Sequence, residues 1–167
     1  MIDISVLKSK RKSSSKFEVM INARRLRVEL SKNVMSDIKI EDLNNENDIY
    51  QMRYMRNIIN DLLRRMTDNI SMANLIYVSN MTEYEERRKF QDYAIGNCYQ
   101  IADELYYLIL FFRNRGIEVN ANKYSRSIKL INNERQLLSA WRKSENSFKK
   151  KYVKSDCNNE QHIKSDK

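Results

Sequence analysis

Apolar residues recur at spacings of three and four along most of the chain, which is the pattern of amphipathic helices. The clearest run begins at Ile49 and continues at Met52, Met55, Ile59, Leu62, Met66, Ile70, Ala73 and Tyr77. It predicts one helix over 49–79, and similar runs predict helices over 17–36, 83–115 and 121–149. At 1.5 Å per residue, about 30 residues reach roughly 45 Å, a length typical of up-down bundles.

Polar residues between these runs predict where helices begin and end. The acidic, Asn-rich stretch 37–48 is the main loop, part of which is alternatively a frayed helix end, and Asp48 is expected to cap the second helix. Thr82 with Glu85 matches a capping box for the third helix. Gly116, preceded by Arg113 and Arg115, predicts its end.

The composition favours the same architecture. The 167 residues include no Pro and only 2 Gly, so hairpins, sandwiches and glycine-rich phosphate loops lack their turn residues. We predict an all-α antiparallel up-down four-helix bundle over 17–150. A basic flexible arm, 1–16, and a polar tail, 151–167, are expected to be disordered at its two ends.

Few residues suit catalysis or metal binding. The single histidine, His162, lies in the polar tail, and helix-borne carboxylates without histidine do not match the di-metal sites of bundles. Cys98 has no histidine close in sequence and is expected to be a packed thiol. These observations predict that the protein is not an enzyme and holds no cofactor. The sequence has no recognisable signal peptide and no long apolar run, so we expect a cytoplasmic protein without a membrane partner.

The net charge of +9 is concentrated at both ends of the chain. Residues 1–36 carry nine Lys or Arg against three Asp or Glu, and 120–154 carry ten against two, whereas 37–119 carry ten against fourteen. An antiparallel bundle can place its first and last helices side by side, and a basic face formed in this way suits a polyanion such as nucleic acid.

The candidate nucleic-acid contacts are basic residues of the first and last helices and of the segment that follows. They are Arg24, Arg25, Arg27, Lys123, Arg126, Lys129, Arg142, Lys143, Lys149, Lys150 and Lys151. Lys123, Arg126 and Lys129 are spaced by three and are expected to follow a phosphate backbone along one strip. Alternatively, these side chains pair with acidic residues of the middle helices in the same or a neighbouring subunit.

The third helix is apolar around more of its circumference than one buried stripe requires, as the unbroken run 105–112 shows. Such a helix must be covered on more than one side, which favours oligomerisation over base stacking by its aromatic residues. The residues expected in the core or in a subunit interface are Tyr106, Leu108, Phe111, Phe112 and Trp141.

Several segments resemble one known family. These are SMANLIYVSN (71–80), Arg87 with Arg88, AIGNCYQIADELYYLI (94–109) and LLSAWRKS (137–144). The span from Met52 to Ser144 is similar to the accessory variability determinants of diversity-generating retroelements and to the related four-helix proteins of 23S rRNA intervening sequences.

This resemblance implies a non-enzymatic homopentamer of four-helix bundles. Such a protein binds the retroelement's reverse transcriptase together with template RNA and cDNA and supports mutagenic cDNA synthesis. The residues that match the family best are Arg87, Arg88 and the segment Trp141–Lys143, and the resemblance implies that Arg87 and Arg88 contact nucleic acid. Two alternatives stay open: an intervening-sequence-type bundle that binds nucleic acid without a polymerase, and a structural bundle that binds another protein.

Overall fold

The computed structural model describes residues 14–36, 43, 45–118 and 121–150, and these residues contain four long helices and no strand. The helices are α1 (Ser14–Ser36), α2 (Glu46–Leu75), α3 (Met81–Arg113) and α4 (Ala121–Ser144). The predicted helical class and the four predicted helices are therefore confirmed. Most of the expected arm and all of the expected tail lie outside the described residues.

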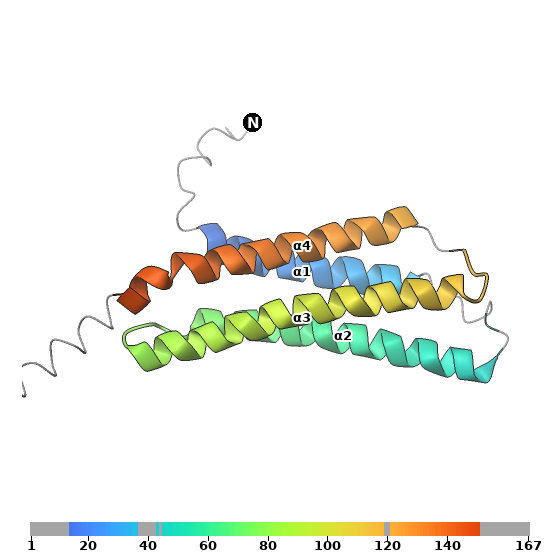
Figure 1. Cartoon of the computed structure of the whole chain (residues 1–167), viewed down its shortest axis with the longest axis horizontal. Coiled ribbons are helices and arrows are strands. Elements are labelled where there is room, and N and C mark those ends of the chain that lie inside the picture. The colour runs from blue at the N-terminus through green and yellow to red at the C-terminus, as the bar shows by residue number, and fades with distance from the viewer. Residues whose placement is uncertain (1–13, 37–42, 44, 119–120, 151–167) are drawn as a thin grey trace, which may run out of the picture.

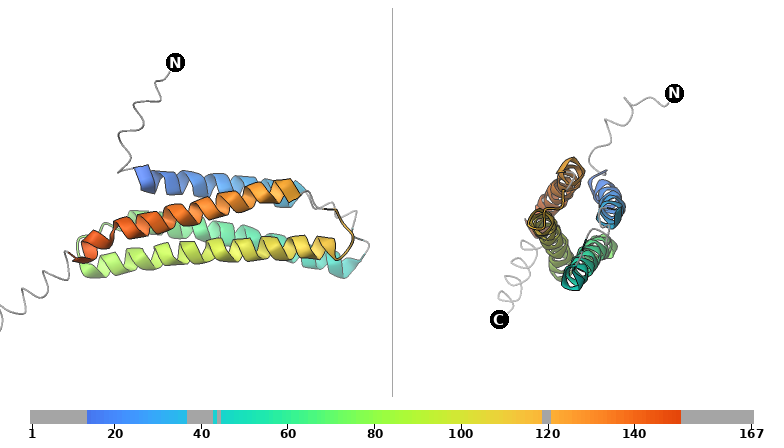
Figure 2. Two further views of the ribbon diagram at one scale, coloured as in Figure 1. Left: turned by 45° about the horizontal axis from the view of Figure 1, so that its top comes forward. Right: turned by 90° about the vertical axis from the view of Figure 1, so that its right-hand side faces the viewer.

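The helices form a bundle in which each one packs against two others. α1 lies between α2 and α4, and α3 contacts the same two helices. The end-on view of Figure 2 shows this four-cornered arrangement, and in Figure 1 the chain reverses direction at each connection. One end of the bundle holds the α2–α3 connection and the C-terminal end of α4. The other end holds the C-terminal ends of α1 and α3 and the starts of α2 and α4.

The predicted apolar stripes supply the core. On α1, Val19, Ala23, Leu26 and Leu30 are fully buried, and their spacing of three and four places them on one helix face. The other helices bury comparable rows, and full burial stabilises each large aliphatic side chain by about 1.5–3 kcal/mol. One position of the predicted apolar run lies outside the core: Tyr77 follows the end of α2 and is 83% exposed.

The start of α3 differs from the prediction by two residues. Asn80, not Thr82, is the N-cap, and its side chain accepts a hydrogen bond from the Glu83 amide at 2.9 Å. The Glu83 carboxylate in turn accepts from the Ser79 amide at 2.7 Å and the Ser79 hydroxyl at 2.6 Å. These two bonds lower the pKa of Glu83. Asn80 bonds to the Glu83 amide while the Glu83 carboxylate bonds back to the Ser79 amide, so the helix start is held by reciprocal hydrogen bonds similar to a capping box.

The second helix is shorter than predicted at its C-terminal end and longer at its N-terminal end. It stops at Leu75, because the following Ile76 adopts an extended conformation that leads into the turn before α3. Its N-cap is Asn45, whose side chain accepts from the Asn47 amide at 2.9 Å. Asp48, the predicted cap, instead pairs with Arg115 at 2.5 Å and joins the start of α2 to the end of α3.

Gly116 ends α3 as predicted, three residues beyond Arg113, the last helical residue. Its φ of 69° lies in the left-handed region, where other residues are strained. Hydrogen bonds from the Gly116 amide to the Arg113 carbonyl and from the Ile117 amide to the Phe112 carbonyl complete a Schellman motif.

The outer helices also differ from their predicted limits. α1 begins at Ser14, so the last three residues assigned to the arm are helical. α4 ends at Ser144 rather than at residue 149, and a turn at Glu145 separates it from the helical residues 146–150.

Candidate nucleic-acid interface

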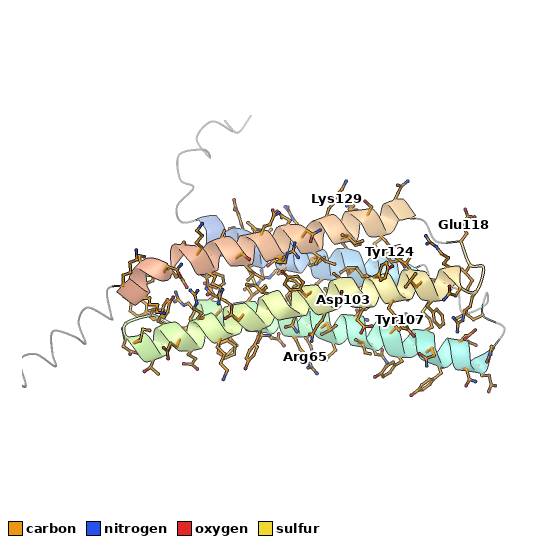
Figure 3. All side chains as sticks on the ribbon, viewed as in Figure 1. Arg65, Asp103, Tyr107, Glu118, Tyr124 and Lys129 are labelled. Atoms are coloured by element: carbon orange, nitrogen blue, oxygen red, sulfur yellow. The ribbon has the colours of Figure 1, made fainter. Side chains whose placement is uncertain are left out.

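The first and last helices lie side by side, an arrangement that an antiparallel bundle allows. Their exposed cations are Arg24, Arg25, Arg27 and Lys32 on α1 and Arg126, Lys129 and Lys143 on α4, and we call this set the basic layer. Lys129 points away from the bundle, whereas Tyr124 of the same helix lies between α4 and α3 (Figure 3).

Acidic side chains compete little for this layer. The acids of α1 and α4 are Glu18, Glu29 and Glu134, and Glu134 is fully buried. Glu29 pairs with Arg126 across the two helices at 3.3 Å. Arg126 stays 74% exposed, so this pair is screened by solvent and contributes little to stability. The cations of the basic layer therefore remain accessible to a polyanion.

A buried polar cluster joins α1 to α4 beneath this surface. The Asn22 side chain donates to the Glu134 carboxylate at 2.6 Å and accepts from the Asn133 amide at 3.0 Å. The other Glu134 oxygen, Oε1, has no hydrogen-bond partner. Burial raises the pKa of Glu134 to about 7, against the opposing effect of the Asn22 hydrogen bond. The cluster fixes how α1 and α4 pair, because a shift along either helix would separate these groups.

Arg87 does not belong to a nucleic-acid surface. It is buried and pairs with Glu145 at 2.7 Å, and it also donates to the Ile76 carbonyl at the end of α2. The same Glu145 carboxylate accepts from the Trp141 indole at 2.8 Å and from the Gln91 amide at 3.0 Å. The predicted role of Arg87 in binding is wrong, because its guanidinium links α2, α3 and the end of α4 inside the bundle.

Arg88 and Arg142 are half-buried and also make contacts within the protein. Arg88 donates to the Tyr84 hydroxyl at 2.8 Å and to the Arg142 carbonyl at 3.2 Å. Arg142 pairs with Asp92 of α3 at 2.6 Å. For Arg142, the alternative of pairing with the acidic middle helices is therefore confirmed.

The remaining basic candidates divide between exposed and undescribed positions. Lys149 and Lys150 are exposed on the helical segment after α4. The side chain of Lys123 and the whole of Lys151 lie outside the described residues, so their expected contacts stay predictions.

Four of the five residues assigned to a core or interface are buried within one protomer. They are Leu108, Phe111, Phe112 and Trp141, each at most 5% exposed. Tyr106 is 65% exposed, and the neighbouring Tyr107 is also exposed. The bundle itself thus covers most of the apolar run 105–112. Within this run, Tyr106 and Tyr107 are exposed and Ile109 and Leu110 are half-buried.

The described part of the chain offers neither a reactive thiol nor a metal-binding cluster. Cys98 is buried beside Met66, and burial raises its pKa to about 12, so the thiol is not a nucleophile near neutral pH. No three His, Cys, Asp or Glu side chains of the described residues are grouped so as to hold a metal ion. None of the helices found there is both long and apolar enough to cross a membrane.

The sequence prediction missed a second surface, at the end of the bundle where α3 begins. Lys89 and Tyr93 are exposed there, and the Lys89 ammonium lies 5.9 Å from the centre of the Tyr93 ring. A Lys–Tyr pair four residues apart on a predicted helix was the available signal.

Comparisons with family models, curated proteins and solved structures find no match to this chain.

Proposed function

We propose that this protein is a non-enzymatic accessory protein of a diversity-generating retroelement, which binds template RNA and cDNA through the basic layer and also binds the reverse transcriptase. The observation that carries the proposal is the pairing of α1 with α4. Two segments separated by the whole acidic middle of the chain meet and expose seven cations on their outer surfaces. Such a layer neutralises phosphates without reading bases.

The resemblance of residues 52–144 to the accessory variability determinants gives the proposal its biological setting. In this proposal the chain is an up-down bundle with basic ends, assembles as a homopentamer and acts in the cytoplasm. The proposal assigns Arg87 and Trp141 to the fold, because both reach Glu145. The nucleic acid is assigned to the exposed cations.

Charge reversal within the basic layer tests RNA binding. We expect Arg24→Glu, Arg25→Glu and Lys129→Glu together to lower RNA affinity at least 100-fold, because three phosphate contacts become repulsive. Fluorescence anisotropy with a labelled RNA measures the affinity, and circular dichroism checks that helix content is unchanged. The matched control reverses three exposed cations of α2, through Arg53→Glu, Arg64→Glu and Arg65→Glu. Equal losses in both triple variants would contradict the assignment.

Co-expression with the reverse transcriptase encoded nearby tests the partner. A stable complex supports the retroelement function. RNA binding without any complex favours the intervening-sequence type of bundle, for which a position inside a ribosomal RNA gene is the second sign. Binding to neither RNA nor a reverse transcriptase would contradict the proposal and favour a protein-binding bundle.

A further inference from the structure

A hollow of about 800 Å³ lies between the start of α3 and the helical segment that follows α4. Its basic and aromatic lining residues are Tyr84, Arg88, Lys89, Tyr93, Lys149 and Lys150. Figure 1 shows these segments meeting at the end of the bundle that holds the α2–α3 connection. The hollow is lined by other residues than the basic layer.

The charge around the hollow is positive. Glu85 and Asp92 also line it, but Asp92 is already paired with Arg142 at 2.6 Å. The four cations that line the hollow, Arg88, Lys89, Lys149 and Lys150, therefore outnumber the remaining acid, Glu85. Arg88 is held in place by the Tyr84 hydroxyl and by the Asn146 side chain at 2.9 Å, so its charge is fixed at the wall of the hollow. This arrangement suits an anionic ligand.

The hollow combines its cations with an exposed aromatic ring. Tyr93 is 50% exposed and lies beside Lys89, whose ammonium is 5.9 Å from the centre of the ring. Aromatic rings stack on unpaired bases, and lysines beside them hold the phosphates, which is the usual composition of single-strand binding sites. A base pair within a duplex does not offer its face in this way.

We propose that this hollow binds a single-stranded segment of nucleic acid, with a base stacked on Tyr93 and phosphates held by Lys89, Lys149 and Lys150. The inference rests on the proposed function and divides it between two surfaces. The basic layer binds the phosphate backbone of either single or double strands, and the hollow binds unpaired nucleotides. The ligand class is thus RNA or cDNA with an unpaired segment.

Substitution of Tyr93 tests the stacking contact. In the full-length protein we expect Tyr93→Ala to weaken binding of a uridine dodecamer about tenfold and to leave binding of a blunt RNA duplex unchanged. Tyr99→Ala is the matched control, since Tyr99 is an equally exposed tyrosine of the same helix outside the hollow. It should bind both RNAs like the unmodified protein.

A photochemical experiment locates the base directly. A uridine dodecamer carrying 5-iodouridine should crosslink to Tyr93 under near-ultraviolet light, and mass spectrometry of the digested protein identifies the residue. Lys149→Glu with Lys150→Glu should remove this crosslink while duplex binding is kept.

The outcomes separate this inference from the proposed function. If the unmodified protein binds both RNAs but Tyr93→Ala has no effect and the crosslink forms elsewhere, the hollow is not the site although the basic layer still is. If the unmodified protein binds no RNA, the proposed function fails and the hollow fails with it. A phosphopeptide that competes with the dodecamer better than RNA does would also overturn the inference.

Discussion

Glu134 is an acidic residue whose surroundings in the bundle differ strongly from water. Its carboxyl group is fully buried, with one oxygen bonded to Asn22 and the other without a hydrogen-bond partner. Burial favours the protonated form, and the pKa rises from 4.5 to about 7. The folded protein therefore binds this proton more tightly than the unfolded chain does.

The pH dependence of stability follows from this shift. The contribution of Glu134 is fully present below about pH 4.5 and is lost as the pH rises to about 7, a change of about 3 kcal/mol. Glu134→Gln should remove this loss, because the uncharged amide keeps an acceptor for Asn22. Urea unfolding at pH 5 and pH 8 measures the difference. We expect the variant to be the more stable protein at pH 8 only.

Glu86→Gln, at an exposed position of α3, is the control for this experiment and should keep the pH dependence of the unmodified protein. A Glu134→Gln variant with the same loss of stability between pH 5 and pH 8 as the unmodified protein would show that Glu134 is ionised without penalty.

Sequence patterns located most of the core at this scale but misjudged individual polar residues. Leu108 and Trp141 lie where the helical period places them, and both are buried. Arg87 was expected to contact nucleic acid because of the family resemblance, and charged residues rarely lie inside a protein. Its burial depends on Glu145, 58 positions away, and only the fold brings the two together. Glu134 is a similar case, since its partner Asn22 lies 112 positions away.

At the scale of the helices, the sequence predicted the end of α3 correctly but missed the N-caps of α2 and α3. Gly116 was identified because a glycine after a long apolar run has one common meaning. The caps at Asn45 and Asn80 were missed because Asp48 and Thr82 offer equally good side chains a few residues later. Which residue caps the helix depends on its neighbours. Ser79 forms a hydrogen bond with Glu83, and Arg115 forms an ion pair with Asp48.

The two glycines allow a paired test at this scale. Gly116→Ala should destabilise the protein by about 1 kcal/mol, because its φ of 69° strains an alanine. Gly96→Ala should stabilise it by about 0.5–1 kcal/mol, since Gly96 lies inside α3 and an added Cβ meets no atom within 4 Å. Thermal unfolding compares them, and changes of the same sign in both variants would contradict the assigned conformations.

The buried ion pair joins three elements at one end of the bundle. Glu145→Ala should lower the free energy of unfolding by about 3–5 kcal/mol, because it leaves the Arg87 guanidinium buried without its carboxylate partner. Arg87→Met with Glu145→Met should recover much of this loss, since no charge then stays buried. Urea unfolding of the single and double variants measures the coupling. If the double variant is no more stable than Glu145→Ala, the unpaired charge of Arg87 is not the cause of the lost stability.

At the scale of the whole molecule, the bundle separates charge between two layers. α1 and α4 carry eleven Lys or Arg against three Glu, whereas α2 and α3 carry eight against ten acids. Many charges of the second layer are paired locally, as Arg64 is with Asp61 and Asp68. This division was predictable from the sequence, because it requires only that the first and last helices are neighbours. The hollow beside Tyr93 was not, because it depends on where the chain turns after Glu145.

The most direct test of the account is the salt dependence of RNA binding by the unmodified protein and by the Arg24, Arg25 and Lys129 triple variant. Fluorescence anisotropy titrations between 50 and 300 mM salt give the slope of log affinity against log salt concentration, which is about −0.7 per phosphate neutralised on a single strand. We predict a steep slope for the unmodified protein and a slope shallower by about 2 for the variant, as expected for three lost phosphate contacts. Tight binding with a flat salt response, or equal slopes in both proteins, would contradict the claim that the basic layer is the nucleic-acid interface.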